Sequence, residues 1–259
     1  MTTGDGRLRF AVHRFESVDS TSDECKRMAD SGAPEGTVAV ARIQTAGRGR
    51  LGRRWISSPG DGLYMSIILR PPLPLDRLWQ IGFALSLATA DAVTKIAGTP
   101  AALKWPNDVL LNKKKISGIL VEAGKWGDGS ESPDRASTVV VGIGINVNTP
   151  DFPSDLVQQA TSVFIETGRR TDLRDVEDAL LAAISDRYRL CLNDGFDRIL
   201  QSWKSIDVTP GRKLTVRLPN ESVEGTAIAI DGDGNLILRR EDGITSCIST
   251  GEIILHNPN

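Results

Sequence analysis

The stretch QTAGRGRLGRRW at positions 44–55 separates two apolar segments and sets the expectations for the rest of the chain. It holds four arginines and three glycines, so it buries little apolar surface, and its guanidinium groups repel one another. Glycine permits backbone angles closed to other residues and a close approach to a ligand. Guanidinium groups present planar donor forks that suit carboxylates and phosphates. The stretch therefore predicts a loop that closes over an anionic ligand.

Composition limits what that anion can be. The 259 residues are 40% hydrophobic and 25% charged, which is typical of a soluble globular protein with a full core. The formal net charge is −2, so the basic stretch is a local feature that favours a small anion over long DNA. Three cysteines, at positions 25, 191 and 247, favour free thiols in a reducing compartment. Neither a signal peptide nor a membrane span is expected, which predicts a cytoplasmic location.

Strand and helix patterns alternate over most of the chain, which predicts an α+β fold. The expected strands cover residues 10–18, 37–41, 63–69, 109–111, 116–122 and 139–147. The run at 139–147 is nearly continuous in apolar residues, as in a central strand buried on both faces. The expected helices cover residues 78–97, 173–192 and 196–203, with a short helix after a capping box at Thr21 and Glu24. Residues 112–115 are expected to join two strands of a hairpin, and the polar segment 124–137 is expected to be a solvent loop.

After Pro210-Gly211 the pattern changes to short strands with tight turns. These strands are expected at 214–218, 224–230, 235–238 and 244–249. We therefore expect a first domain over residues 1–208 and a small all-β domain over residues 209–259, with the boundary near Thr209.

Three further polar stretches have two interpretations each. The hydroxyls of Ser20-Thr21-Ser22 suit a helix cap, or a site that binds a small polar head group. The turn KWPND at 104–108 suits the surface, or a site for a phosphate and a hard cation such as magnesium. Lys113 and Lys114 are expected to be solvated, whereas Lys115 adjoins a strand and could point either inward or outward.

Two motifs resemble ligand sites, a dinucleotide fingerprint and a calcium loop, but each lacks a required feature. GIGIN at 142–146 lacks the third glycine and the strand–loop–helix setting of a dinucleotide fingerprint. DGDGN at 231–235 lacks the downstream glutamate of a calcium loop and is typical of a hairpin turn. No His/Cys cluster has the spacing of metal ligands.

Taken together and in order, five motifs resemble those of biotin protein ligases. They are DSTS at 19–22, Gln44 with GRGRLGRRW at 47–55, KWPND at 104–108, KISGILVE at 115–122 and GIGINVN at 142–148. The resemblance runs from about residue 15 to the C-terminus. It implies a central domain like that of class II aminoacyl-tRNA synthetases, with a mixed, mostly antiparallel sheet and helices packed on one side. It also implies a small C-terminal SH3-like β-barrel.

The resemblance implies a two-step reaction. ATP converts the biotin carboxylate to biotinyl-5′-AMP with release of pyrophosphate, and a lysine of a carrier domain then attacks. Bringing a carboxylate to a triphosphate requires preorganised positive charge, and Mg²⁺ would take up phosphate charge. A covalent enzyme intermediate is not expected.

The resemblance also assigns residues to the site. Arg48, Arg50 and Lys115 are the expected catalytic residues. Biotin is expected to contact Ser20, Thr21, Ser22, Gln44, Arg48, Gly49, Arg50, Lys115 and Gly118. ATP is expected to contact Arg50, Arg53, Trp55, Lys104, Asn107 and Asn146. Asn107 and Asp108 are the expected magnesium ligands.

The partner implied is a biotin carboxyl carrier domain of acetyl-CoA carboxylase or a related carboxylase. Many bacterial relatives carry an N-terminal winged-helix domain and act as repressors. Here the Ser-Thr-Ser motif begins at residue 20, which leaves no room for such a domain, so DNA binding as a repressor is not expected. Membrane binding is not expected either, because no segment is long and apolar enough to span a bilayer. Both a monomer and a homodimer fit the sequence. One alternative is a lipoate ligase or transferase, whose substrate could not use the polar Ser20, Thr21 and Gln44. The other is a non-catalytic protein that binds biotin or a carrier domain.

Overall fold

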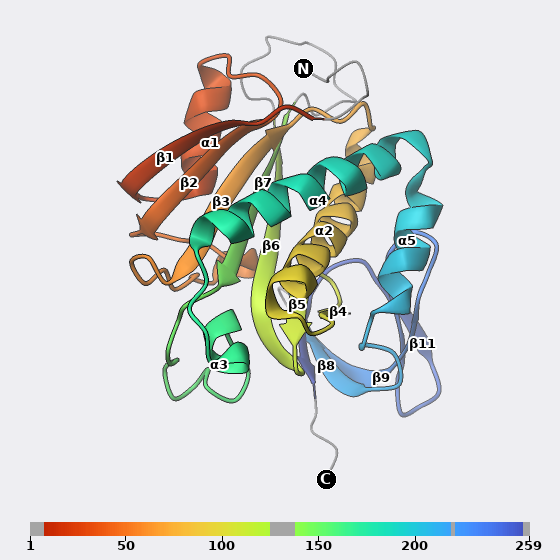
Figure 1. The fold of residues 1–259 in the computed structure, drawn as a ribbon. Helices are drawn as coiled ribbons and strands as arrows, with labels where there is room; N and C mark the ends of the chain where they lie inside the picture. The colour runs from red at the N-terminus through yellow and green to blue at the C-terminus, as the bar shows by residue number, and fades with distance from the viewer. Residues whose placement is uncertain (1–7, 125–137, 219–220, 256–259) are drawn as a thin grey trace.

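The computed structural model describes residues 8–124, 138–218 and 221–255, and within these it has two β-sheets and five α-helices (Figure 1). The expected solvent loop at 124–137 lies outside the described residues except for its first residue. No described helix is long and apolar enough to cross a membrane.

The larger sheet is mixed and mostly antiparallel, as expected. Only its first pair of strands is parallel. In spatial order the strands are β1 (Ala11–Val18), β2 (Thr37–Gln44), β3 (Gly62–Leu69), β7 (Thr138–Asn146), β6 (Lys114–Gly124), β5 (Asp108–Leu111) and β4 (Ala102–Lys104). The apolar run at 139–147 is therefore the central strand of the sheet.

Helices cover both faces of this sheet. On one face, alternate residues of β7 such as Val139 and Val141 join the main core with α2 (Trp79–Ala97) and α4 (Leu173–Asn193), which cross the sheet in Figure 1. On the other face, Val140 packs with the apolar side of α1 (Thr21–Asp30). The expectation of helices on one side is thus right for α2 and α4 but wrong for α1.

Beside α1, this second face has three positions without side chains. Gly142 and Gly144 alternate along β7, and they pair with Ser66 on β3 and Gly118 on β6 respectively. Directly paired residues share a face. The three glycines therefore form a floor, which we call the glycine floor, next to the start of α1.

Two local predictions are off by one or two residues. Ser20, and not Thr21, is the N-cap of α1, and its side chain accepts a hydrogen bond from the Ser22 backbone N–H at 3.2 Å. The β5–β6 turn is formed by Asn112 and Lys113, both with positive φ, so residues 114 and 115 already belong to β6.

The C-terminal residues form a five-stranded antiparallel sheet, preceded by α3 (Val163–Thr167) and α5 (Phe196–Ser205). The strands are β11 (Thr245–Ile248), β10 (Leu236–Arg239), β9 (Ser222–Ile230), β8 (Lys213–Arg217) and β12 (Glu252–Leu255), in that spatial order. In the described part of the chain no ladder joins β11 to β12, so the sheet is not a closed barrel.

Hydrogen bonds fasten this second sheet to the first one. The Trp105 indole N–H donates to the Gly234 carbonyl at 2.9 Å, and the Trp105 backbone N–H donates to Thr209 Oγ1 at 2.9 Å. Gly234 lies so close to α2 that a β-carbon there would come within 2.5 Å of the Trp79 ring. These contacts hold the β9–β10 turn of the second sheet against β4 and α2. The β11–β12 turn is contacted instead by Arg50 of the basic stretch 44–55, which we call the basic loop.

Candidate active site

The first part of the site is a cluster of hydroxyl and amide groups at the start of α1. Thr21 donates from its backbone N–H and its hydroxyl to Gln44 Oε1, at 2.9 and 3.0 Å. The hydroxyls of Thr21 and Ser22 also lie 2.8 and 3.1 Å from Ser66 Oγ. Of the three hydroxyls only that of Ser20 caps the helix, so Thr21 and Ser22 are turned toward the glycine floor.

Arg48 ties the basic loop to α1 and β6. Its guanidinium group binds both oxygens of Asp23, one of them at 2.6 Å, and reaches Glu122 at 3.5 Å. Lys26 binds the other Glu122 oxygen at 2.7 Å. The hydrogen bond from Arg48 lowers the pKa of the Asp23 carboxyl, against the effect of burial. Two carboxylates thus compensate the charge of Arg48.

Arg50 differs, because its hydrogen-bond partners are neutral. It donates to Asn107 Oδ1 at 3.4 Å, to the Gly251 carbonyl at 3.2 Å and to Thr250 Oγ1 at 2.8 Å. Burial lowers the pKa of the Arg50 guanidinium, and the charge of Asp108 partly opposes this. A partly buried cation whose partners are neutral attracts an anionic ligand.

Asp108 holds two ammonium groups beside Arg50. Its carboxylate oxygens lie 2.5 Å from Lys115 Nζ and 2.8 Å from Lys104 Nζ. Burial acts to raise the pKa of Asp108, but the two ammonium groups outweigh it and the pKa is lowered. Lys115, which could have pointed either way, therefore points inward.

Trp55, at the end of the basic loop, lies on the glycine floor. A β-carbon on Gly144 would come within 2.4 Å of its ring, and one on Gly118 within 3.2 Å. Lys115 Nζ is 5.7 Å from the centre of the ring. The indole N–H is buried and finds no acceptor among the described residues. The absence of side chains at the two glycines is what allows the loop to approach the sheet.

Four other residues predicted to contact biotin or ATP have partners within the chain. Arg53 pairs with Glu252 of β12, and Asn146 donates to the Thr161 carbonyl at 3.0 Å. Gly49 donates to the Arg53 carbonyl at 2.7 Å inside the loop. Asn107 donates to the Ile119 carbonyl at 2.7 Å.

The predicted magnesium ligands are already occupied by partners within the chain. Both oxygens of Asp108 bind lysines, and the Asn107 oxygen accepts from Arg50. No group of three or more His, Cys, Asp or Glu side chains in the described part of the chain could hold a metal ion. The positive charge in this corner comes from Arg50, Lys104 and Lys115.

Several residues of the site were not predicted from the sequence. Ser66 is a single polar residue in an apolar strand, and Asp23 and Glu122 hold Arg48 in place. The alternation of glycines in GIGIN could have indicated a bare strand face at Gly144. Sequence distance hides the contact between Arg50 and the β11–β12 turn.

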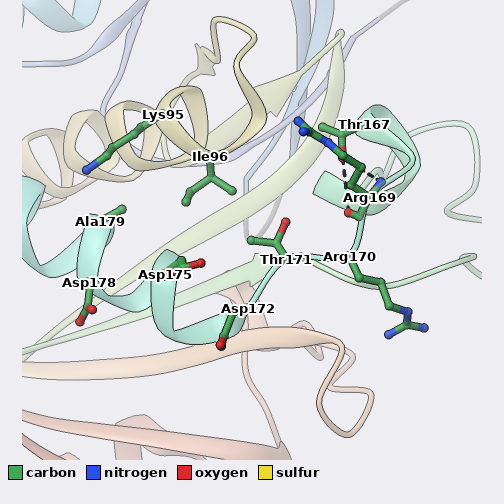
Figure 2. Close-up of a pocket in the computed structure, with 10 residues that line it drawn as sticks. All are labelled: Lys95, Ile96, Thr167, Arg169, Arg170, Thr171, Asp172, Asp175, Asp178 and Ala179. Atoms are coloured by element: carbon green, nitrogen blue, oxygen red, sulfur yellow. Dashed lines mark hydrogen bonds between the residues drawn. The ribbon is translucent and has the colours of Figure 1, made fainter.

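A separate cavity of about 590 Å³ lies on the helical face of the molecule, between the end of α2 and the start of α4 (Figure 2). Charges of both signs line it, from Lys95, Arg169, Arg170, Asp172, Asp175 and Asp178. None of the predicted site residues lines this cavity, so it is distinct from the site on the glycine face.

The fold and the site define an α+β protein with a binding site for anions on one face of a mixed sheet. Comparison with known proteins identifies its family. The model of the biotin/lipoate A/B protein ligase family matches residues 14–146, and that of the biotin protein ligase C-terminal domain matches residues 210–256. The chain therefore belongs to the biotin/lipoate A/B protein ligase family. The C-terminal match is to a domain of the biotin protein ligases within it.

Similar proteins agree with this assignment. The bifunctional ligase/repressor BirA of Bacillus subtilis is 38% identical over 90% of this chain and 70% of its own length. The biotin–[acetyl-CoA-carboxylase] ligase of Mycobacterium tuberculosis is 31% identical over 91% of this chain and 85% of its own. The structure of the Aquifex aeolicus biotin protein ligase with biotin and ATP has a TM-score of 0.79 and 31% identity, and covers 95% of this chain and 99% of that one.

Proposed function

We propose that this chain is an ATP-dependent biotin protein ligase. It activates biotin as biotinyl-5′-AMP and transfers the biotinyl group to a lysine of a biotin carboxyl carrier domain. The observation that carries the proposal is the partly buried Arg50, whose partners are neutral, beside two lysines held by Asp108. A hydroxyl-lined corner for a polar head group lies on the same face of the sheet.

In the first step, a carboxylate oxygen of biotin attacks the α-phosphorus of ATP. The bond to the β-phosphate oxygen breaks, and pyrophosphate leaves with its electron pair. The reacting groups are all anionic, so preorganised cations lower the barrier. Arg50 and Lys115 are the proposed cations at the reacting atoms, and Arg48 holds the loop on α1. Asn107 and Asp108 would hold Mg²⁺, which would supply positive charge against the triphosphate.

In the second step, the neutral amine of a carrier lysine attacks the acyl carbon. AMP leaves, an amide bond forms, and the amine loses a proton. The chain itself forms no covalent intermediate in this proposal. Burial raises the pKa of the Cys25 thiol to about 12 and that of Cys191 to about 11, so these groups are poor nucleophiles.

We assign the ureido ring of biotin to Ser20, Thr21, Ser22 and Gln44, and the acyl chain to the side of Gly118 and Gly49. The nucleotide is assigned to Lys104, Asn107, Trp55, Arg53 and Asn146. Arg53 and Asn146 have partners within the chain and would release or share them when ATP binds. Asn107 and Asp108 remain the proposed magnesium ligands, and they too would release or share their partners within the chain when ATP binds.

The proposed partner is the carrier domain of acetyl-CoA carboxylase or a related carboxylase, as the names of the relatives suggest. The free thiols Cys25, Cys191 and Cys247 support a cytoplasmic location. We also propose that the chain binds neither DNA nor membranes and that it is a monomer or a homodimer. The proposed boundary between its two domains lies near Thr209.

The test is pyrophosphate exchange into ATP, followed by labelling of a purified carrier domain. Biotin should stimulate the exchange, and intact-mass measurement should then show one biotinyl group on the carrier lysine. Exchange that responds to lipoate and ignores biotin would favour the lipoate ligase. Binding of biotin without any labelling would favour the non-catalytic binding protein.

A further inference from the structure

A connected set of hydroxyl and amide groups lines the head-group corner of the site. It runs from Ser22 through Ser66 and Thr21 to Gln44. Ser66 lies in the middle of this set, is fully buried in β3, and has no part in the functional assignments above. Each of these groups has a limited number of hydrogens to donate, so the directions of the bonds can be worked out.

The backbone of Thr21 fixes the first direction. A backbone N–H can only donate, so the Gln44 atom 2.9 Å from it must be the carbonyl oxygen Oε1. That oxygen carries no hydrogen, so the Thr21 hydroxyl must donate to it across 3.0 Å. The single hydrogen of Thr21 is therefore used within the chain.

The remaining directions follow from this one. Because Thr21 has no hydrogen left, the 2.8 Å contact with Ser66 requires Ser66 to donate to Thr21. Because Ser66 then has none left, the 3.1 Å contact requires Ser22 to donate to Ser66. All hydrogens point from Ser22 toward Gln44, and the three hydroxyls keep only lone pairs for a ligand.

We propose that Ser66 is a positioning residue that sets the head-group specificity of the site. By donating to Thr21, it makes the hydroxyl wall a pure acceptor that binds ring N–H groups and repels ring oxygens. The cyclic urea of biotin offers two such N–H groups. This inference rests on the proposed biotin ligase function and adds to it a residue that acts through Thr21 and Ser22.

The test compares biotin with its two cyclic carbamate analogues, in each of which one ring N–H is replaced by oxygen. Calorimetry gives the Kd of each ligand for the wild-type chain and for Ser66→Ala. Without Ser66 the hydrogen of Ser22 is free to turn toward the ligand, so a ring oxygen becomes tolerable. We expect biotin to bind about tenfold more weakly, the size of one hydrogen bond. The preference for biotin over the disfavoured carbamate should fall by about fivefold or more.

Kinetics separate positioning from a general structural effect. In Ser66→Ala the KM for biotin should rise, whereas kcat and the KM for ATP should stay within about twofold. Ser66→Thr keeps the hydroxyl and should retain the preference. Ser117→Ala is the matched control, because Ser117 is equally buried in β6 but faces away from the glycine floor. Thermal unfolding shows that each variant is folded.

Equal weakening of biotin and carbamate binding in Ser66→Ala, or no weakening, would overturn the inference. If Ser66→Ala does not fold, the same binding measurements are made on Ser66→Cys. A thiol is only a weak donor, so the preference for biotin should fall there too. A wild-type chain that fails to bind biotin contradicts the proposed function itself. A wild-type chain that binds biotin, with an unchanged preference in the variants, contradicts only the role of Ser66.

Discussion

Asp108 positions both ammonium groups of the cationic corner, since Lys104 and Lys115 each bind one of its oxygens. Asp108→Asn would leave two cations without a shared counter-charge, and they would move apart. We expect kcat/KM for pyrophosphate exchange to fall about 10- to 100-fold. Asp91→Asn removes a surface partner of Arg187 and serves as the control. A pyrophosphate exchange rate in Asp108→Asn equal to that of the wild type would show that Lys104 and Lys115 do not need Asp108 to position them.

Arg50 is the basic-loop residue best placed to retain an adenylate, because its hydrogen-bond partners are neutral. Arg50→Gly should release biotinyl-5′-AMP at least about tenfold faster and label lysines of bystander proteins. Rapid filtration after a single turnover measures the dwell time. Arg54→Gly is the control within the same loop, because the Arg54 side chain is exposed and donates to the Thr45 carbonyl at 3.1 Å. An unchanged dwell time in Arg50→Gly would refute this role.

At this scale the sequence predicted residue types better than residue partners. The cations and hydroxyls of the motifs do meet on one face of the sheet. Ser66 and Glu122 could not be assigned, because contacts between distant strands depend on register, which a single sequence does not determine. The neutral surroundings of Arg50 were equally hidden, since they come from a turn about 200 residues away.

Gly118 of β6 and Gly144 of β7 leave the space in which Trp55 of the basic loop packs on the sheet. Gly144→Ala would place a β-carbon 2.4 Å from the Trp55 ring, closer than packed atoms allow. We expect the indole to leave the glycine floor, exchange activity to fall more than about tenfold, and trypsin to cleave after the loop arginines more rapidly. The chain should remain folded. In Gly82→Ala the added β-carbon would come within 3.3 Å of the Val121 side chain, and this variant should behave as the wild type. Normal activity and protection in Gly144→Ala would mean that the loop closes without this seat.

Element prediction succeeded where periodicity extends over several turns or a long apolar run. The helices α2 and α4 and the central strand β7 follow their patterns closely. The strands β4 and β12 were missed because three or four residues carry too little pattern. The side of the sheet on which α1 packs was predicted wrongly, because an amphipathic helix fits either face.

Across the whole molecule, the junction between the two sheets contains a partly buried acid, Asp207. Asp207 accepts from the backbone N–H and hydroxyl of Thr209, while its other oxygen has no partner among the described residues. Burial raises its pKa to about 6, and the bonds from Thr209 only partly oppose this. Between about pH 4 and 6 the folded chain thus binds more protons at this site than the unfolded chain.

The stability contributed by Asp207 should therefore fall as the pH rises through this window, by at most about 3 kcal/mol. Urea unfolding at pH 4.5 and pH 6.5 measures the difference in free energy of unfolding. Asp207→Asn should remove this part of the pH dependence. The exposed Asp233→Asn is the control. An identical pH dependence in wild type and Asp207→Asn would show that Asp207 titrates normally.

Mass spectrometry of the purified chain, after incubation with ATP, Mg²⁺ and either biotin or lipoate, tests most directly whether the chain forms an adenylate and from which acid. A cationic corner beside an acceptor-lined head-group site predicts biotinyl-5′-AMP, retained at about one equivalent per chain, and no lipoyl adenylate. A lipoyl adenylate formed in preference, or no adenylate from either acid, would contradict the proposed biotin ligase function.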